Sequence, residues 1–279
     1  MTDFQKFLDT GFKQFMLIIG EKINASIPSV RSIIQQRDED ILVNLSQAQA
    51  NAGASHIDVN VGTGLGSQDD EISDITWAID TIQQKVEIPI SIDSADPAVL
   101  EAGLKVRNGR QSIINSTKAE DESLIKILPL AVHYQTPIVA LAMDQQGIPK
   151  TVEDRLQASQ KVAAACQKSG LPLEMVFFDP LVIPVSTDVK QGLITLETLS
   201  AIKKAFPMAK TVIGLSNVSY GLPERTRLNA AFLHMATFAG LDAVIIDPLI
   251  EELMGAVKTV EVLVGRDRHC RRYTRAFRK

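Results

Sequence analysis

The chain alternates short apolar runs with longer amphipathic segments, and this alternation is the feature that most limits its fold. The short runs are rich in β-branched residues and predict strands, whereas the longer segments have helical spacing. The predicted strands are 16–20, 56–61, 89–93, 112–115, 137–143, 175–179, 211–215 and 243–247. A predicted helix follows each of them, at 38–53, 70–86, 97–106, 121–134, 152–169, 196–206, 227–239 and 250–264. Such an alternation favours parallel strands joined by right-handed crossovers.

Eight strand–helix units in 279 residues predict a closed TIM (β/α)8 barrel, a fold that usually takes about 250 residues. Hydrophobic residues make up 45% of the chain but aromatic residues only 5%, which suits parallel strands buried on both faces. No Pro- or Gly-rich linker divides the sequence, so we predict one domain over residues 1–279. Residues 1–15 form an N-terminal extension, in which the spacing of the phenylalanines predicts a short amphipathic helix.

Charge and composition exclude several classes of partner. The net charge of −4 gives no global attraction to nucleic acid or to an anionic membrane. No apolar run reaches the roughly 18 residues that span a bilayer, and no signal-peptide pattern is present. We therefore expect a cytoplasmic location. Cys166 and Cys270 lack the spacing of a metal site and are expected to be reduced thiols, with a disulfide between them left open.

The C-terminal tail, residues 266–279, is strongly basic. Seven lysines and arginines against one aspartate give it a local charge of +6, which leaves −10 for the rest of a chain of net charge −4. Charge runs of this kind usually form a solvated helix. The alternative is a docking patch for an acidic partner protein.

Polar residues stand at the carboxyl ends of seven of the eight predicted strands. They are Glu21 and Asn24, Asp58 and Asn60, Asp93 and Ser94, Asn115 to Thr117, Asp179, Ser216 and Asn217, and Asp247. Each could cap the helix that follows, and Asp247 could do no more than that. In a barrel, however, all these ends face one mouth, where ligands bind. We therefore expect them to form a single site.

The chemistry of this set is selective. It holds no histidine or cysteine, which gives little support to a histidine-based zinc site or a Ser-His-Asp triad, although paired aspartates could hold a divalent metal. Lys22 and Lys118 are expected beyond their strands, which disfavours a Schiff-base aldolase. A carboxylate accepts two parallel donors, and an amide both donates and accepts. This combination suits the hydrogen-bonding edge of a pterin ring.

Six motifs resemble those of the pterin-binding methyltransferases, in the same order. They are GEKIN at 20–24, DVNVG at 58–62, IDS at 92–94, INST at 114–117, DPL at 179–181 and GLSNVS at 214–219. The pattern is similar to that of the methyltetrahydrofolate:corrinoid protein methyltransferases, relatives of the folate module of cobalamin-dependent methionine synthase. This resemblance implies a TIM barrel, typically a homodimer. It also implies methyl transfer between N5 of tetrahydrofolate and the cobalt of a corrinoid (cobalamin) carried by a separate protein.

The resemblance also implies roles for individual residues, and no metal ligand among them. The implied pterin-binding residues are Glu21, Asn24, Asp93, Asn115, Asp179, Gly214, Ser216, Asn217 and Arg225. Asn217 matches the asparagine that bonds near N5, and we expect it to be catalytic by stabilising charge rather than by supplying a proton. Tyr220 departs from the pattern, since relatives carry glutamine there. It could mark a different corrinoid partner or be a simple loop aromatic.

Two other functions remain open from the sequence. A dihydropteroate synthase-like enzyme would share the barrel and the pterin pocket, but the cationic signature for its diphosphate leaving group is not evident. A folate-binding scaffold without activity is the non-enzymatic alternative, and the presence of Asn217 argues against it. The resemblance covers both directions of transfer, toward the corrinoid in acetyl-CoA synthesis and toward folate in demethylation.

Overall fold

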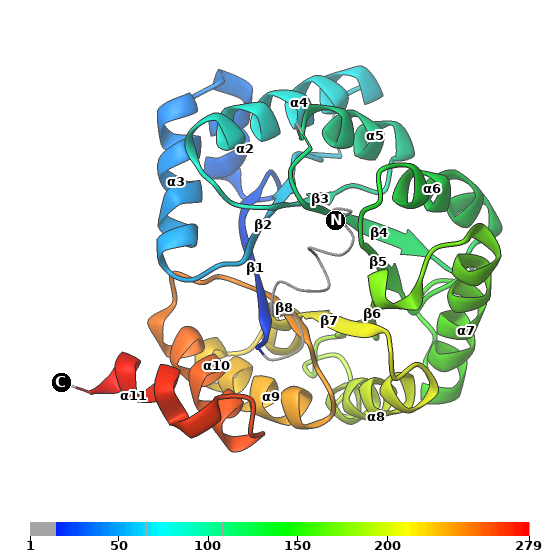
Figure 1. Ribbon diagram of the computed structural model, residues 1–279, viewed down its shortest axis with the longest axis vertical. Helices are drawn as coiled ribbons and strands as arrows, with labels where there is room; N and C mark the ends of the chain where they lie inside the picture. Colours follow the sequence, from blue (N-terminus) through cyan, green and yellow to red (C-terminus); the bar gives the residue numbers. More distant parts are fainter. Residues whose placement is uncertain (1–14, 65, 108, 279) are drawn as a thin grey trace.

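The computed structural model describes residues 15–64, 66–107 and 109–278. Within them, eight parallel strands close into a barrel in sequence order, from β1 to β8 (Figure 1). The strands are β1 Leu17–Asn24, β2 His56–Asn60, β3 Ile90–Asp93, β4 Ser112–Lys118, β5 Ile138–Leu141, β6 Val176–Asp179, β7 Lys210–Gly214 and β8 Ala243–Ile246. The predicted TIM barrel is confirmed.

Helices surround the strands as an outer ring (Figure 1). The α-helices are α2 Pro28–Gln36, α3 Glu39–Asn51, α4 Gln68–Lys85, α5 Pro97–Val106, α6 Asp121–His133, α7 Val152–Ser169, α8 Gln191–Ala205, α9 Arg225–Phe238, α10 Glu251–Leu263 and α11 Arg271–Phe277. Single 3-10 turns lie at η1 Leu173–Met175, η2 Leu215–Ser219 and η3 Arg268–Cys270.

Local sequence signals explain many of the element boundaries. Asp38 caps α3 as expected, because its carboxylate accepts a hydrogen bond from the Ile41 N–H. Ser67 and Asp70 form a reciprocal capping box at the start of α4. Fully buried isoleucines at neighbouring positions, such as Ile113 and Ile114 on β4, fill both faces of a strand, so the core lies inside the barrel and beneath the helices.

Four elements differ from the predictions. Strand β1 continues to Asn24, four residues beyond its predicted end. Helix α2 was not predicted, and α8 begins at Gln191, five residues before the predicted start at 196. Gln191 is a buried polar residue whose amide bonds Asp188 and Arg155, so no apolar pattern marks this first turn. Strand β4 continues through the polar segment to Lys118, with a bulge between Asn115 and Thr117.

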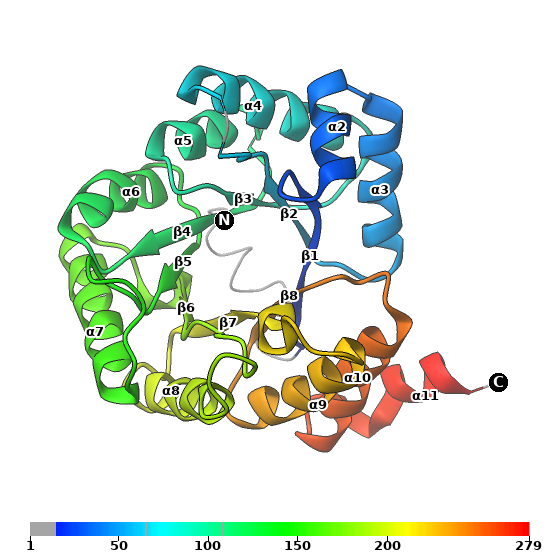
Figure 2. The same cartoon turned by 180° about the vertical axis from the view of Figure 1, so that it is seen from behind.

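The C-terminal tail forms α11 on the outside of the helix ring, beside α10 (Figures 1 and 2). Arg272 pairs with Glu261 at 3.2 Å and lies over the Phe15 ring at 4.1 Å. Because Phe15 precedes β1, these contacts lie at the amino end of the barrel, away from the mouth. The side chains of α11 are mostly exposed, as expected of a solvated helix. Residues 1–14, for which a helix is predicted, lie outside the described residues.

Neither cysteine is bonded to the other. Cys166 is buried in α7, where burial raises the pKa of its thiol to about 12, and Cys270 is exposed. Among the described helices, none is long and apolar enough to cross a membrane.

Candidate active site

The carboxyl ends of the strands enclose a cleft of about 530 Å³. Eight of the nine predicted binding residues line it, namely Glu21, Asn24, Asp93, Asn115, Asp179, Gly214, Ser216 and Asn217. Most of the residues predicted from the sequence are therefore brought together in one cleft. Arg225 is the exception and lies behind the cleft.

The floor of the cleft is a network of paired carboxyl and amide groups on β2, β3 and β4. The Asn115 amide donates to Asp58 at 3.2 Å, and the Asn60 amide donates to Asp93 at 2.8 Å. Burial, and then the negative charge of Asp93, raise the pKa of Asp58 well above its ordinary value. Burial also raises the pKa of Asp93, whose carboxyl is hydrogen-bonded to that of Asp58. Burial and the proximity of the two carboxyl groups thus favour a pair that holds one proton between them.

Asp179 forms a second part of the floor, at the end of β6. Its carboxylate accepts the Leu181 N–H at 2.7 Å. Burial raises the pKa of Asp179 to about 7, against the opposing effects of that N–H and of the nearby Arg155 guanidinium. This carboxyl group therefore titrates near neutral pH, so it can accept a hydrogen bond and, when protonated, donate one.

Arg155 is fully buried in α7 and supports this part of the mouth. Its guanidinium donates to the carbonyls of Pro180 and Leu181 at 2.9 and 2.8 Å. It also donates to the Pro149 carbonyl at 2.9 Å and to the Gln191 amide oxygen at 3.1 Å. One side chain thus fixes the loops that follow β5 and β6. No sequence pattern predicts this role, because a lone arginine in a helix usually faces solvent.

One wall of the cleft is the 3-10 turn η2 after β7, which carries Ser216 and the exposed side chain of Asn217. Gly214 gives the Asn217 amide its room, since a Cβ atom at this position would lie 3.2 Å from Nδ2. Arg225 starts α9 and donates to the Ser216 carbonyl at 2.7 Å and to the Ser219 hydroxyl at 3.0 Å. Arg225 therefore clamps the turn that presents Asn217 and does not line the cleft itself.

A bulge in β1 shapes the remaining wall. Gly20 pairs with Ile57 and Ile23 with Val59, so β1 has one residue more than β2 over this span. The Lys22 N–H, released from the ladder, donates to the Gln49 side chain at 3.1 Å. Gly20 is required here, because a Cβ atom would collide with Gln49. The bulge turns Glu21 and Lys22 into the cleft.

Both lysines near the strand ends lie within their strands, contrary to expectation. Lys22 belongs to β1 and pairs with Asp247 at 3.0 Å, and Lys118 belongs to β4 and pairs with Glu120 at 2.8 Å. Asp247 does not cap α10, whose first turn begins after Ile250. It is a cleft residue that holds the Lys22 ammonium.

Glu21 lies between the β1 wall and η2. Its carboxylate accepts the Ser216 hydroxyl at 3.4 Å. Burial and the charge of Asp247 raise the pKa of Glu21 to about 7, while Ser216, Lys22 and Arg225 oppose this shift. Glu21 is thus a second carboxyl group in the cleft that titrates near neutral pH.

The cleft residues missing from the predicted set are mainly Lys22, Asp58 and Asp247. The signal for the two aspartates was present, because both stand in the run of polar strand ends. Their functional and capping uses could not be separated from sequence. Lys22 was expected beyond its strand, since the bulge that turns it inward depends on Gln49, which is distant in sequence.

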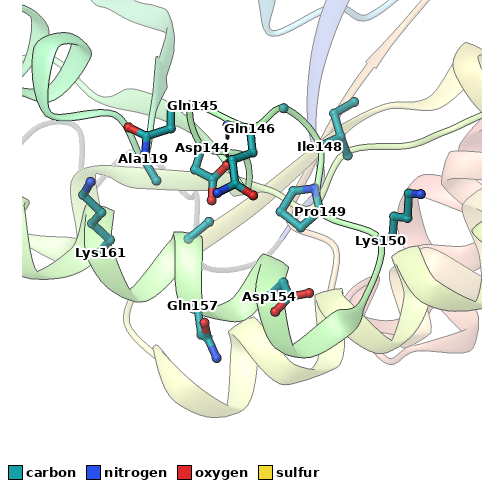
Figure 3. A pocket seen from close by; sticks show the side chains of 12 residues that line it. Ala119, Asp144, Gln145, Gln146, Ile148, Pro149, Lys150, Asp154, Gln157 and Lys161 are labelled. Atoms are coloured by element: carbon teal, nitrogen blue, oxygen red, sulfur yellow. Dashed lines mark hydrogen bonds between the residues drawn. The ribbon is translucent and has the colours of Figure 1, made fainter.

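A second recess of about 660 Å³ adjoins the cleft, and Ile148 lines both. It is formed by the β5–α7 loop and the exposed side of α7 (Figure 3). The loop folds back on itself through paired backbone hydrogen bonds between Asp144 and Gly147. The mouth therefore has additional room beside the carboxylate floor.

No group of three or more His, Cys, Asp and Glu side chains in the described part of the chain is arranged to hold a metal ion. The acidic groups of the floor are instead bonded to amides and to each other. This arrangement offers acceptors and donors to an uncharged polar ring.

Comparison with known proteins decides the family. The model of the family described as pterin binding enzyme matches residues 20–247, which include every strand after the first three residues of β1. The chain belongs to the pterin-binding enzyme family. The family expected from the six motifs is confirmed.

Within the pterin-binding family, the chain is 35% identical over 266 residues to methylcorrinoid:tetrahydrofolate methyltransferase of Eubacterium limosum, covering 95% of this chain and 97% of the relative. It is 30% identical over 247 residues to methionine synthase of Mycobacterium leprae, of which it spans only 20%. Among solved structures, 7,8-dihydropteroate synthase of Vibrio fischeri superposes with a TM-score of 0.71 over 91% of this chain and 94% of that one. At 19% identity this likeness supports the fold alone.

Proposed function

We propose that this pterin-binding enzyme is a methyltransferase that moves a methyl group between N5 of tetrahydrofolate and the cobalt of a corrinoid on a separate protein. The observation that carries the proposal is the joining of the buried Asp–Asn floor and the exposed Asn217 amide in one cleft. The similarity to the Eubacterium limosum methyltransferase extends over nearly the whole chain and supports the same reaction.

The floor would recognise the pterin. The ring presents an amino group, a ring N–H and a carbonyl along one edge, and Asp93 could accept two parallel donors from it. Asn115 and Asp179 would complete this set, since the first has an amide and the second a carboxyl group that titrates near neutral pH. Because the floor groups are buried, their hydrogen bonds to a ligand would be stronger than in water.

Methyl transfer would take place above the floor, next to Asn217. Toward folate, N5 attacks the methyl carbon, the C–Co bond breaks with its electron pair left on cobalt, and N5 loses its proton. Toward the corrinoid, the same bonds are made and broken in reverse, and N5 must be protonated or hydrogen-bonded to leave. An amide can donate to the N5 lone pair or accept from its N–H, so Asn217 suits both directions.

The corrinoid protein would have to cover the mouth, because the cobalt must approach the methyl carbon. The family resemblance also supports a homodimer as the state of this protein in solution, which sedimentation velocity would test.

The direct test is methyl transfer with purified components. Methyltetrahydrofolate and cob(I)alamin are mixed with the enzyme, and consumption of the Co(I) absorbance is followed, with methylcobalamin and tetrahydrofolate as the reverse reaction. We expect enzyme-dependent transfer in both directions. Tight folate binding without transfer, either to free cobalamin or to a corrinoid protein, would contradict the proposal and favour a folate-binding scaffold.

Dihydropteroate synthase activity is the alternative, and the cleft argues against it. That reaction needs cations for a diphosphate leaving group. Lys22 is already paired with Asp247, and Arg225 is bound to the η2 turn behind the cleft. A condensation assay with p-aminobenzoate separates the two functions, and we expect no dihydropteroate to form.

A further inference from the structure

Two cavities meet at Glu21. Besides the cleft, a chamber of about 310 Å³ lies between β1, η2, α9 and the start of α10. Glu21, Ser216 and Asp247 line both spaces, so these three residues make the wall between them. Arg225 and Asn229 line only the chamber.

The chamber is suited to water. Asn229 is 5% exposed, and its Oδ1 atom has no hydrogen-bond partner among the described residues. An unpaired buried acceptor costs about 1–3 kcal/mol, and a bound water usually removes that cost. Thr226 and Arg225 line the same space. A chamber of this size has room for several waters, since each takes about 30 Å³ in the liquid.

The charged and polar groups that act on Glu21 come from β1 itself, β8, η2 and α9. Lys22 follows it on β1, Asp247 lies at the end of β8, Ser216 lies on η2 and Arg225 lies on α9. The Ser216 hydroxyl is directed at the Glu21 carboxylate, and Ser216 is the residue before Asn217. The carboxyl group is therefore next to the turn at which the proposed function has N5.

The proposed reaction needs a path for the N5 proton, and the contacts that Asn217 could make do not provide one. When the N5–CH3 bond forms and the C–Co bond breaks, the N5 proton must leave, and in the reverse direction it must return. Asn217 cannot take up a net proton near neutral pH. A corrinoid protein over the mouth would also shield the cleft from bulk water. The proton therefore needs a titratable group with access to solvent from another side.

We propose that Glu21 is the proton-relay residue of this enzyme, exchanging the folate N5 proton with solvent through the chamber behind β1 and η2. This inference rests on the proposed methyl transfer. The other carboxyl groups of the cleft fit the role less well. Asp58, Asp93 and Asp179 do not line the chamber, and Asp179 already accepts the Leu181 N–H.

The test compares the wild type with Glu21→Gln, which keeps the shape of the side chain and an acceptor for Ser216. Single-turnover methyl transfer from methylcobalamin to tetrahydrofolate is measured from pH 5 to 9, with folate affinity measured by calorimetry at each pH. The wild-type rate should rise with pH through about 7, the pKa of Glu21, because the carboxylate form takes up the proton. The rate of Glu21→Gln should show no such rise with pH, and its plateau should lie about 100-fold below that of the wild type. This is the usual size of a general acid–base contribution. Its folate Kd should stay close to that of the wild type.

Glu120→Gln is the matched control, because Glu120 stands beyond β4 and lines neither cavity. It should keep the wild-type pH profile. As a second variant, Asn229→Leu keeps the shape of the side chain but removes the polar atoms that would hold water in the chamber. It should slow transfer while leaving folate affinity unchanged.

The outcomes separate the two proposals. If the wild type transfers the methyl group and the rate of Glu21→Gln still rises with pH through about 7, the proposed relay role is wrong and the proposed methyl transfer stands. If Glu21→Gln loses folate affinity by the same factor as rate, Glu21 is a binding residue and the relay is again wrong. If the wild type binds folate but transfers no methyl group at any pH, the proposed function itself fails.

Discussion

On the floor of the cleft, Asp58, Asp93 and Asn115 stand on neighbouring paired strands, are largely buried and bond one another. Asn217 stands instead on one 3-10 turn, with an exposed side chain, and Arg225 holds that turn from behind. The floor is rigid because each group is fixed by its neighbours. On the η2 wall, Arg225 fixes the turn, whereas the side-chain amide of Asn217 is exposed. Under the proposed function, the fixed floor would recognise the ring, and the wall would act on the group that changes during the reaction.

The largest effect should come from Asn217→Ala. Loss of an amide that stabilises charge in the transition state typically lowers turnover by about 10²–10³-fold. Folate affinity should change by less than about threefold, because the floor is untouched. Single-turnover rates and calorimetric Kd values check this, with Gln145→Ala, an exposed amide of the adjoining recess, as control. A loss in affinity equal to the loss in rate would remove the distinction between wall and floor.

The converse variant is Asp93→Asn on the floor. The substitution removes a charge-assisted acceptor, which we expect to weaken folate affinity by roughly 10–100-fold. The rate at saturating folate should fall much less. Calorimetry with tetrahydrofolate measures the effect, and Asp144→Asn in the adjoining recess provides the control. Unchanged affinity would take Asp93 out of the pterin site.

The floor should also make stability depend on pH. Burial raises the pKa of Asp179 from 3.8 to about 7, so the folded protein holds this proton more tightly than the unfolded chain. The resulting stabilisation is complete below pH 3.8 and is lost as the pH rises through about 7. Asp179→Asn removes the cost of ionisation, and at pH 8 it should raise the free energy of unfolding by about 2–4 kcal/mol relative to its effect at pH 4. Urea denaturation of both proteins at several pH values measures this, and parallel pH curves would show that Asp179 does not titrate in this range.

The smallest effect should come from deletion of residues 271–279, a region that belongs to neither wall. The tail contacts Glu261 and Phe15 at the amino end of the barrel. We therefore expect an unchanged KM for the corrinoid protein and a loss of stability of about 1 kcal/mol, the size of a partly exposed ion pair. A raised KM would instead support the docking patch considered from the charge of the tail.

The floor could be predicted from sequence to a much greater extent than the η2 wall. Strands and their polar ends are local signals, and parallel strands bring Asp93, Asn115 and Asp179 to one edge whatever the details of the loops. The position of Arg225 was not predictable, because its direction depends on the η2 turn that it clamps. The inward turn of Lys22 likewise depends on a bulge in β1, where Gln49 of α3 accepts the hydrogen bond of the Lys22 N–H. Contacts of this kind join distant segments and leave no periodic pattern in the chain.

The buried Arg155 has a consequence for how the mouth can vary among relatives. Its guanidinium bonds the β5–α7 loop at Pro149, the segment after β6 at Pro180 and Leu181, and the start of α8 at Gln191. A loop transplanted from another barrel without its own partner for this guanidinium would leave a buried charge unsatisfied, next to Asp179. The two loops and Arg155 are therefore one structural unit, and a variant that exchanges one loop keeps this arginine satisfied only if it exchanges its partners as well.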